Sequence, residues 1–163
     1  MTIQMAPVAF VRGGRADIRD DRWGGSQAVI ELVADMPAES LEGIEAFSHA
    51  EILFVFDRSP LADIVTGSRH PRGNPAWPRV GIFAQRAKAR PNRIGATIVR
   101  IVGRDGGRLR VEGLDAIDGT PVLDIKPVLA EFLPSGPVRQ PEWTRELMRD
   151  YWTPVEDDED ARN

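Results

Sequence analysis

Two segments hold most of the side chains that could do chemistry. The first, at residues 86–93, places four cations within eight positions: Arg86, Lys88, Arg90 and Arg93. The second, at 113–119, places Asp115 and Asp118 three positions apart. A basic loop close to an acidic turn favours a ligand that carries both charges, or a nucleotide bound together with a cationic cofactor.

Each feature also has a simpler interpretation. Aspartates in turns commonly bond to their own backbone, so Asp115 and Asp118 are also typical turn residues. The basic loop belongs to a larger cationic stretch, because residues 69–110 contain ten arginines and Lys88 against a single acid, Asp105. One such arginine is usually solvated on a strand face, whereas the crowded loop favours a site for phosphates or other polyanions.

The composition excludes several kinds of site. The chain has no cysteine, which excludes disulfides, thiolate catalysis and cysteine-ligated metals. It has only two histidines, so we expect no metal site. Neither of the usual nucleotide-binding loops, G-x-G-x-x-G or G-x-x-x-x-G-K-[ST], occurs. His49 precedes an apolar strand, where a histidine bonded to the backbone is more typical than a catalytic base.

The elements that must position these residues are mostly short strands. We expect strands at 5–12, 26–34, 52–56, 80–84, 95–102, 108–114 and 122–126, with a hairpin turn at 105–107. The continuously apolar stretch 52–56 predicts a strand buried on both faces. Apolar spacings of three predict a helical turn at 40–47 capped by Ser40, and spacings of four predict an amphipathic helix at 142–152. Such a pattern favours a β-barrel or sandwich over a Rossmann sheet.

The connections and ends complete the organisation. The loop at 12–25 carries Trp23, which we expect to be a hydrophobic anchor, and the proline-rich loop at 59–79 is expected to form a lid or an arm. We expect one domain at 1–153 and an acidic, disordered tail at 154–163. No apolar run approaches the roughly 20 residues of a membrane helix, and no export signal is evident. These features predict a cytoplasmic protein without membrane association.

The chain contains three motifs in a fixed order: FSHAEILFVF at 47–56, GIFAQRAKARPNRIG at 81–95 and LDAIDGTPVLDIKP at 114–127. Together they closely resemble the TsaA-like family, whose best-known type is the TrmO tRNA N6-methyltransferase. The resemblance implies a mainly β fold, a compact antiparallel β-barrel with a short helical turn and a C-terminal helix. It also implies S-adenosylmethionine as cofactor, a homodimer, and methylation of N6 of threonylcarbamoyladenosine at position 37 of a tRNA anticodon loop.

The resemblance also assigns residues to roles. It implies a cofactor site made of residues from four parts of the chain: Ser26, Gln27, Asp57, Arg58, Arg86, Leu114, Asp115, Asp118 and Gly119. It implies a substrate or RNA site in the basic loop: Lys88, Arg90, Asn92 and Arg93. Loss of the N6 proton calls for a nearby base, and position in the motifs favours Asp57 or His49.

Departures from the family pattern keep other functions open. The family usually has Asn-Pro-Ile-Gly where this chain has Asn92-Arg93-Ile94-Gly95, and its longer members carry a second C-terminal domain. One alternative is a methyltransferase that acts on a small molecule. Another is a non-catalytic barrel that binds S-adenosylmethionine or RNA.

Overall fold

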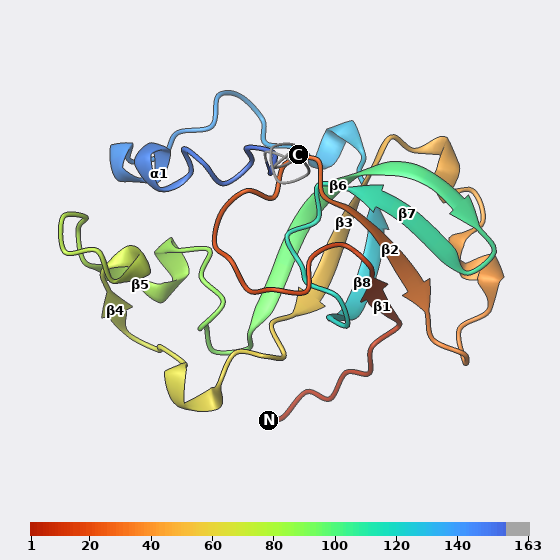
Figure 1. The fold of residues 1–163 in the computed structure, drawn as a ribbon, viewed down its shortest axis with the longest axis horizontal. Coiled ribbons are helices and arrows are strands. Elements are labelled where there is room, and N and C mark those ends of the chain that lie inside the picture. The colour runs from red at the N-terminus through yellow and green to blue at the C-terminus, as the bar shows by residue number, and fades with distance from the viewer. Residues whose placement is uncertain (156–163) are drawn as a thin grey trace, which may run out of the picture.

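The computed structural model describes residues 1–155, and its centre is a closed antiparallel barrel. Six strands follow one another around it in the order β1-β2-β7-β6-β3-β8. Their bounds are Ala9–Arg12 (β1), Gln27–Leu32 (β2), His49–Val55 (β3), Ile94–Asp105 (β6), Arg108–Glu112 (β7) and Pro121–Pro127 (β8). The expected mainly β fold, an antiparallel barrel with a helical turn and a C-terminal helix, is confirmed (Figure 1).

The barrel interior follows the period of two that strands impose on their side chains. In β3, Ala50, Ile52 and Phe54 are buried, and they pack with residues such as Ile30 and Leu109 from the other strands. The outward-facing residues of 52–56 are only half-buried, so the prediction of burial on both faces is wrong. The reason is that a barrel has one packed face, its inside.

The connections β2–β3 and β6–β7 are of the kinds predicted from the sequence, a helical turn and a hairpin. The helical turn is a pair of 3₁₀ helices, Ala38–Leu41 and Ile44–Ala46, separated by Gly43. Ser40 lies inside the first of them and does not cap it, so that part of the prediction is wrong. Asp105 pairs with Arg108 across a two-residue hairpin loop, as the glycines at 106 and 107 predict.

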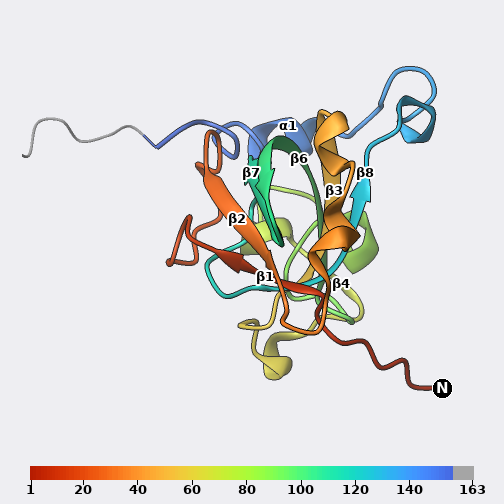
Figure 2. The same cartoon turned by 90° about the vertical axis from the view of Figure 1, so that its right-hand side faces the viewer.

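Residues 59–93, which we call the arm, form a separate lobe beside the barrel. The arm contains the two-stranded sheet of β4 (Ser68–Arg69) and β5 (Val80–Gly81), with 3₁₀ helices at Leu61–Asp63, Pro71–Gly73 and Ile82–Ala84. The strand predicted at 80–84 is therefore only two residues long and continues as a 3₁₀ turn. In Figure 2 the barrel faces the viewer and the arm lies behind it.

The C-terminal segment (residues 141–155) packs on the arm, as Figure 1 shows. Its helix α1 spans Glu142–Leu147, shorter than the predicted 142–152. The Trp143 ring lies 6.4 Å from that of Trp77 in the arm, centroid to centroid. Beyond the helix, the carbonyls of Asp150 and Tyr151 accept hydrogen bonds from the amides of Arg22 and Trp23 in the 13–26 loop, at 3.0 and 2.8 Å. The Asp150 carbonyl also accepts from the Thr153 amide at 3.4 Å, so residues after Leu147 form turns tied to this loop.

Two general findings concern residues 1–155. No helix in this range is long and apolar enough to cross a membrane. No group of three histidine, cysteine or acidic side chains gathers there in a way that could hold a metal ion. Most of the predicted acidic tail, residues 156–163, lies outside the described part of the chain.

Candidate functional site

The six barrel strands alternately begin and end around one mouth of the barrel, which we call the barrel end. Strands β2, β6 and β8 begin here, at Gln27, Ile94 and Pro121, and their antiparallel neighbours β1, β3 and β7 end here, at Arg12, Val55 and Glu112. The two motifs around Arg86 and Asp115 connect to strands at this mouth, because the arm enters β6 here and the turn between β7 and β8 crosses it. The topology therefore brings together segments that are far apart in the sequence.

The turn between β7 and β8 (residues 113–120) is held by many hydrogen bonds. Ser26 donates from its hydroxyl to the carbonyl of Leu114 at 3.2 Å and accepts from the Gly113 amide at 2.8 Å. The Asp118 carboxylate accepts from the Gly13 amide at 2.8 Å, and its own amide donates to the Arg15 carbonyl at 2.7 Å. The turn and the 13–26 loop are thus built as one unit.

Both carboxylate oxygens of Asp115 accept hydrogen bonds from side-chain hydroxyl groups. One of its carboxylate oxygens accepts a hydrogen bond from the Thr97 hydroxyl, and the other accepts from the Tyr151 hydroxyl. Burial raises the pKa of Tyr151 well above its usual value, and the neighbouring Asp115 charge raises it further. Arg86 and Arg72 act on this pKa in the opposite direction, which places both guanidinium groups in the same neighbourhood. Tyr151 therefore stays protonated and can only donate to the carboxylate.

Three arginines point their guanidinium groups at backbone carbonyls of the barrel end. Arg58 donates to the carbonyl of Asp118 at 3.1 Å, and Arg86 donates to the carbonyl of Ala96. Arg93 donates to the carbonyls of Asp57 and Ser59, both at 3.2 Å. Within residues 1–155 none of these three forms an ion pair with a carboxylate, so their positive charges remain uncompensated at short range. Such charges suit the carboxylate or phosphate of a ligand.

Arg93 also has an unusual backbone conformation. Its φ is 52°, in the left-handed region that few residues other than glycine adopt. Proline, which the family pattern has at this place, holds φ near −65° and cannot adopt that conformation. The backbone at this departure from the family pattern is therefore one that the family's proline would not permit.

The arm is tied to the 13–26 loop by ion pairs. Arg72 contacts Asp21 with both terminal nitrogens, at 2.9 and 2.6 Å. Lys88 of the arm lies 3.4 Å from Asp20 of the loop. Within the arm, Arg90 donates to the Gln85 carbonyl at 3.2 Å. Trp23 is buried, which confirms its expected role as an anchor, and the Arg15 guanidinium stacks over its ring at 4.3 Å.

The structure brings most, but not all, of the expected site residues together. Its contacts join these residues around the β7–β8 turn: Ser26, Arg58, Leu114, Asp115, Asp118 and Gly119. Arg86 joins them through Ala96, the neighbour of Thr97. Gln27 and Asn92 are exposed at the rim. His49 begins β3 whereas Asp57 follows its end, so within one chain these two cannot serve the same site.

Sequence reasoning missed two residues of this cluster. Tyr151 was expected on a helix face, and Thr97 was expected only as part of a strand. Both contact Asp115 from 36 and 18 positions away, and a single hydroxyl in a strand or helix gives no signal of such a contact.

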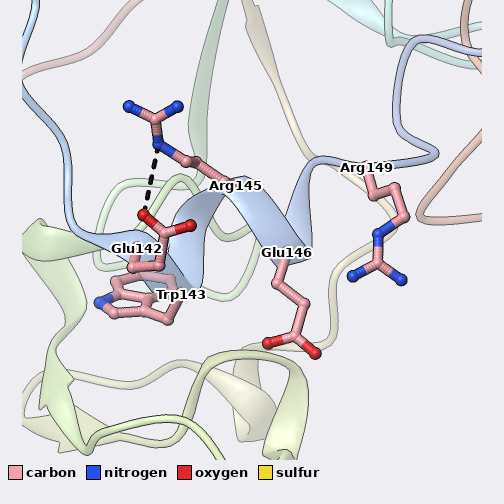
Figure 3. Close-up of a pocket in the computed structure, with 5 residues that line it drawn as sticks. All are labelled: Glu142, Trp143, Arg145, Glu146 and Arg149. Carbon is pink, nitrogen blue, oxygen red and sulfur yellow. Dashed lines mark ion pairs between the residues drawn. The ribbon is translucent and has the colours of Figure 1, made fainter.

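A hollow lies along α1, between Glu142, Trp143, Arg145, Glu146 and Arg149 (Figure 3). It contains none of the expected site residues. Two of its polar groups are already used, since Glu142 pairs with Arg145 at 3.5 Å and Glu146 accepts from the Trp77 indole at 2.8 Å. We therefore assign the candidate site to the barrel end.

Comparison with known proteins identifies the family of this chain. Residues 19–132 match the family model described as the tRNA-methyltransferase O N-terminal domain. A probable S-adenosyl-L-methionine-binding protein of Methanothermobacter thermautotrophicus is 35% identical over 134 residues, which cover 78% of this chain and 90% of that protein. The human tRNA (adenine(37)-N6)-methyltransferase is 40% identical over 118 residues, 72% of this chain but only 26% of the human protein.

A solved structure extends the likeness to three dimensions. The crystal structure of TrmO from Pseudomonas aeruginosa superposes with a TM-score of 0.69 at 33% identity, covering 85% of this chain and 61% of that one. The chain thus spans about a quarter of the human relative and less than two thirds of the bacterial one. The matched segment contains the basic loop and the β7–β8 turn, and on these grounds the chain belongs to the tRNA-methyltransferase O N-terminal domain family.

Proposed function

We propose that this chain is an S-adenosylmethionine-dependent methyltransferase that methylates N6 of threonylcarbamoyladenosine at position 37 of tRNA. The observation that carries the proposal is the convergence of uncompensated arginines and the β7–β8 turn at one barrel end. Relatives named as tRNA (adenine(37)-N6)-methyltransferases and as S-adenosylmethionine-binding proteins support it.

The residues at the barrel end fit the charges of this cofactor. The Asp115 carboxylate has two oxygens, each with one lone pair left after its bond to Thr97 or Tyr151, and these can accept from ribose hydroxyls. Arg86 carries a charge that can meet the cofactor's carboxylate. In this proposal Ser26, Arg58 and the remainder of the turn shape the pocket by holding its backbone.

The cofactor supplies an electrophilic methyl group on a positively charged sulfur. With the cofactor held by Asp115 and Arg86, that methyl group would be available to the N6 nitrogen of the base, whose proton would pass to a nearby side chain. Asp57, exposed at the end of β3, is the base that we propose, while His49 at the opposite end of β3 is not within reach in the same chain. Most of the rate enhancement then comes from positioning the two reactants.

The basic loop is proposed to bind the anticodon loop. Bases in such a loop are unpaired and can enter a pocket at small unstacking cost. Lys88, Arg90 and Arg93, with Asn92 at the rim, would contact its phosphates and sugars. We propose accordingly that the protein acts in the cytoplasm, where its tRNA substrate is found.

A homodimer is also proposed, on the basis of an outward-facing apolar strip on two neighbouring strands. Leu53 and Val55 of β3 face out next to β6, where Ile98 is 49% exposed. Light scattering is expected to give twice the chain mass, and Ile98→Glu is expected to shift it to a monomer. A monomeric wild type would contradict this part of the proposal.

The test of the function starts with calorimetric titration by S-adenosylmethionine. We expect micromolar affinity for the wild type and a loss of about 30- to 100-fold in Arg86→Ala, because a charge-assisted bond to the ligand is removed. Arg108→Ala, an arginine on the outer barrel face, is the matched control and should bind normally.

The second step is incubation with tRNA that lacks the methyl group, followed by mass spectrometry of its nucleosides. A gain of one methyl at position 37 is expected. Cofactor binding with transfer only to small molecules would favour the alternative substrate class. Binding with no transfer to any acceptor would favour a non-catalytic barrel, and no cofactor binding at all would refute the proposal.

A further inference from the structure

The Asp115 carboxylate is held from both sides by hydroxyl groups of different origin. Thr97 belongs to β6 and is 7% exposed, so its hydroxyl is a fixed part of the barrel. Tyr151 belongs to the C-terminal segment, which lies outside the barrel and outside the family motifs. A carboxylate with two fixed donors cannot rotate, and its remaining lone pairs therefore point in set directions.

Tyr151 itself is held firmly through its backbone. Its carbonyl accepts from the Trp23 amide at 2.8 Å, and the carbonyl of Asp150 accepts from the Arg22 amide at 3.0 Å. Gly24 completes this junction by its lack of a side chain, since a Cβ there would lie 1.9 Å from the Trp152 carbonyl oxygen. The C-terminal segment therefore lies directly on the 13–26 loop.

The other side of the C-terminal segment is fixed to the arm. Glu146 accepts from the Trp77 indole at 2.8 Å, and the rings of Trp77 and Trp143 are in contact. The hydroxyl of Tyr151 is thus positioned by the same two elements, the loop and the arm, that surround the barrel end. This arrangement makes the C-terminal segment one wall of the site.

We propose that Tyr151 is a positioning residue of the cofactor site: its hydroxyl fixes the Asp115 carboxylate in the orientation that binds the cofactor. This inference rests on the proposed function. It assigns a role to a segment that contributes no residue to the motifs, and it predicts that Tyr151 acts on the ligand only through Asp115.

The test is a double-mutant cycle measured as the affinity for S-adenosylmethionine. Tyr151→Phe keeps the ring and removes only the hydroxyl, and we expect about tenfold weaker binding, the usual effect of losing one bond to a charged group. In an Asp115→Asn background the same substitution should change the affinity less than twofold, because coupled residues are not additive. Thr153→Val removes a hydroxyl that bonds only to the Asp150 carbonyl and should bind as the wild type does.

A second variant moves Tyr151 without changing it. Gly24→Ala introduces a Cβ against the Trp152 carbonyl and should displace the segment, with a similar loss of affinity. Gly67→Ala, where a Cβ meets nothing within 4 Å, is its control. The melting temperatures of all variants are measured alongside, so that a purely structural role, which would lower stability and leave the affinity unchanged, is recognised.

Three outcomes would overturn the inference while leaving the proposed function intact. They are an unchanged or tighter affinity in Tyr151→Phe, an equal loss in the Asp115→Asn background, and a normal affinity in Gly24→Ala. The failure of the wild type to bind S-adenosylmethionine is distinguishable from these, and it would remove the proposed function and this inference together.

Discussion

The arginines of this chain form two groups that differ in their partners. On the outer barrel face, arginines pair with glutamates: Arg108 lies 2.7 Å from Glu31, and Arg104 lies 3.3 Å from Glu45. At the barrel end, Arg58, Arg86 and Arg93 donate to backbone carbonyls. Both groups come largely from the same cationic stretch of sequence.

The two groups differ in how much of their positive charge is available to a ligand. A carboxylate beside a guanidinium cancels its field at distances beyond a few ångströms, whereas a neutral carbonyl leaves the charge in place. The glutamates that pair with arginines on the outer face, Glu31 of β2, Glu45 of the 3₁₀ helix before β3 and Glu112 at the end of β7, lie outside the cationic stretch. A count of charges along the sequence therefore overstates the basic surface and does not locate it.

The largest expected difference is in the free energy of unfolding, when one arginine of each group is replaced by alanine. Arg93→Ala removes one bond to the carbonyl of Asp57, just after β3, and one to that of Ser59, at the start of the arm. We expect the free energy of unfolding to fall by about 1–3 kcal/mol. Arg108→Ala should change it little, because exposed ion pairs contribute little. Urea denaturation of both variants measures this, and equal effects would contradict the distinction.

Stability at alkaline pH should depend on Tyr151, in the C-terminal segment beside the barrel end. The usual pKa of tyrosine is 10.0, and in the folded protein burial and Asp115 raise that of Tyr151. Above pH 10 the unfolded chain loses this proton while the folded one keeps it, so stability falls with rising pH, by up to about 1.4 kcal/mol per unit. Thermal melts from pH 8 to 11 should show this loss in the wild type and a smaller one in Tyr151→Phe. Parallel curves would mean that Tyr151 is not held as described.

A third comparison uses the salt dependence of tRNA binding. If Arg90 contacts one phosphate, Arg90→Ala should reduce the slope of log affinity against log salt by about 0.7. Arg100→Ala, on the outer face beside Glu112, should leave the slope unchanged. Filter binding at four salt concentrations distinguishes the two, and a change confined to Arg100→Ala would reverse the assignment of the RNA surface.

The smallest effect is expected when an outer-face arginine loses its acidic partner and so becomes like the unpaired arginines of the barrel end. Glu31→Gln removes the carboxylate between Arg12 and Arg108, so the outer face gains available positive charge. Non-specific RNA binding should rise roughly twofold at low salt and return to the wild-type level at high salt. No rise at low salt would show that Glu31 does not mask these arginines.

Much of the fold could be predicted because its signals are local. Alternating apolar residues, the glycines at 106 and 107 and the turn at 118–121 give the strands and the hairpin. The secondary-structure predictions fail where contacts between residues distant in the sequence override the local preference for a helix or strand. The helix expected to reach Trp152 stops at Leu147, and the residues that follow it bond through the carbonyls of Asp150 and Tyr151 to the 13–26 loop.

Some features of the candidate site could likewise be predicted from the sequence, and others could not. The cationic loop and the acidic turn are visible in the sequence, since both are runs of a few residues with a distinct composition. The contact of Tyr151 with Asp115, and the distance of His49 from Asp57, depend on barrel closure and on the direction of β3. Neither can be read from spacing along the chain.

By itself, the sequence determined the strand pattern, the two charged motifs and the family, because each depends on neighbouring residues. Which arginines pair with a carboxylate, and which side chains surround Asp115, depends on the three-dimensional fold. The physical reason is that charge cancellation and hydrogen bonding depend on distances in space, and barrel closure sets those distances between residues as far apart as Glu31 and Arg108.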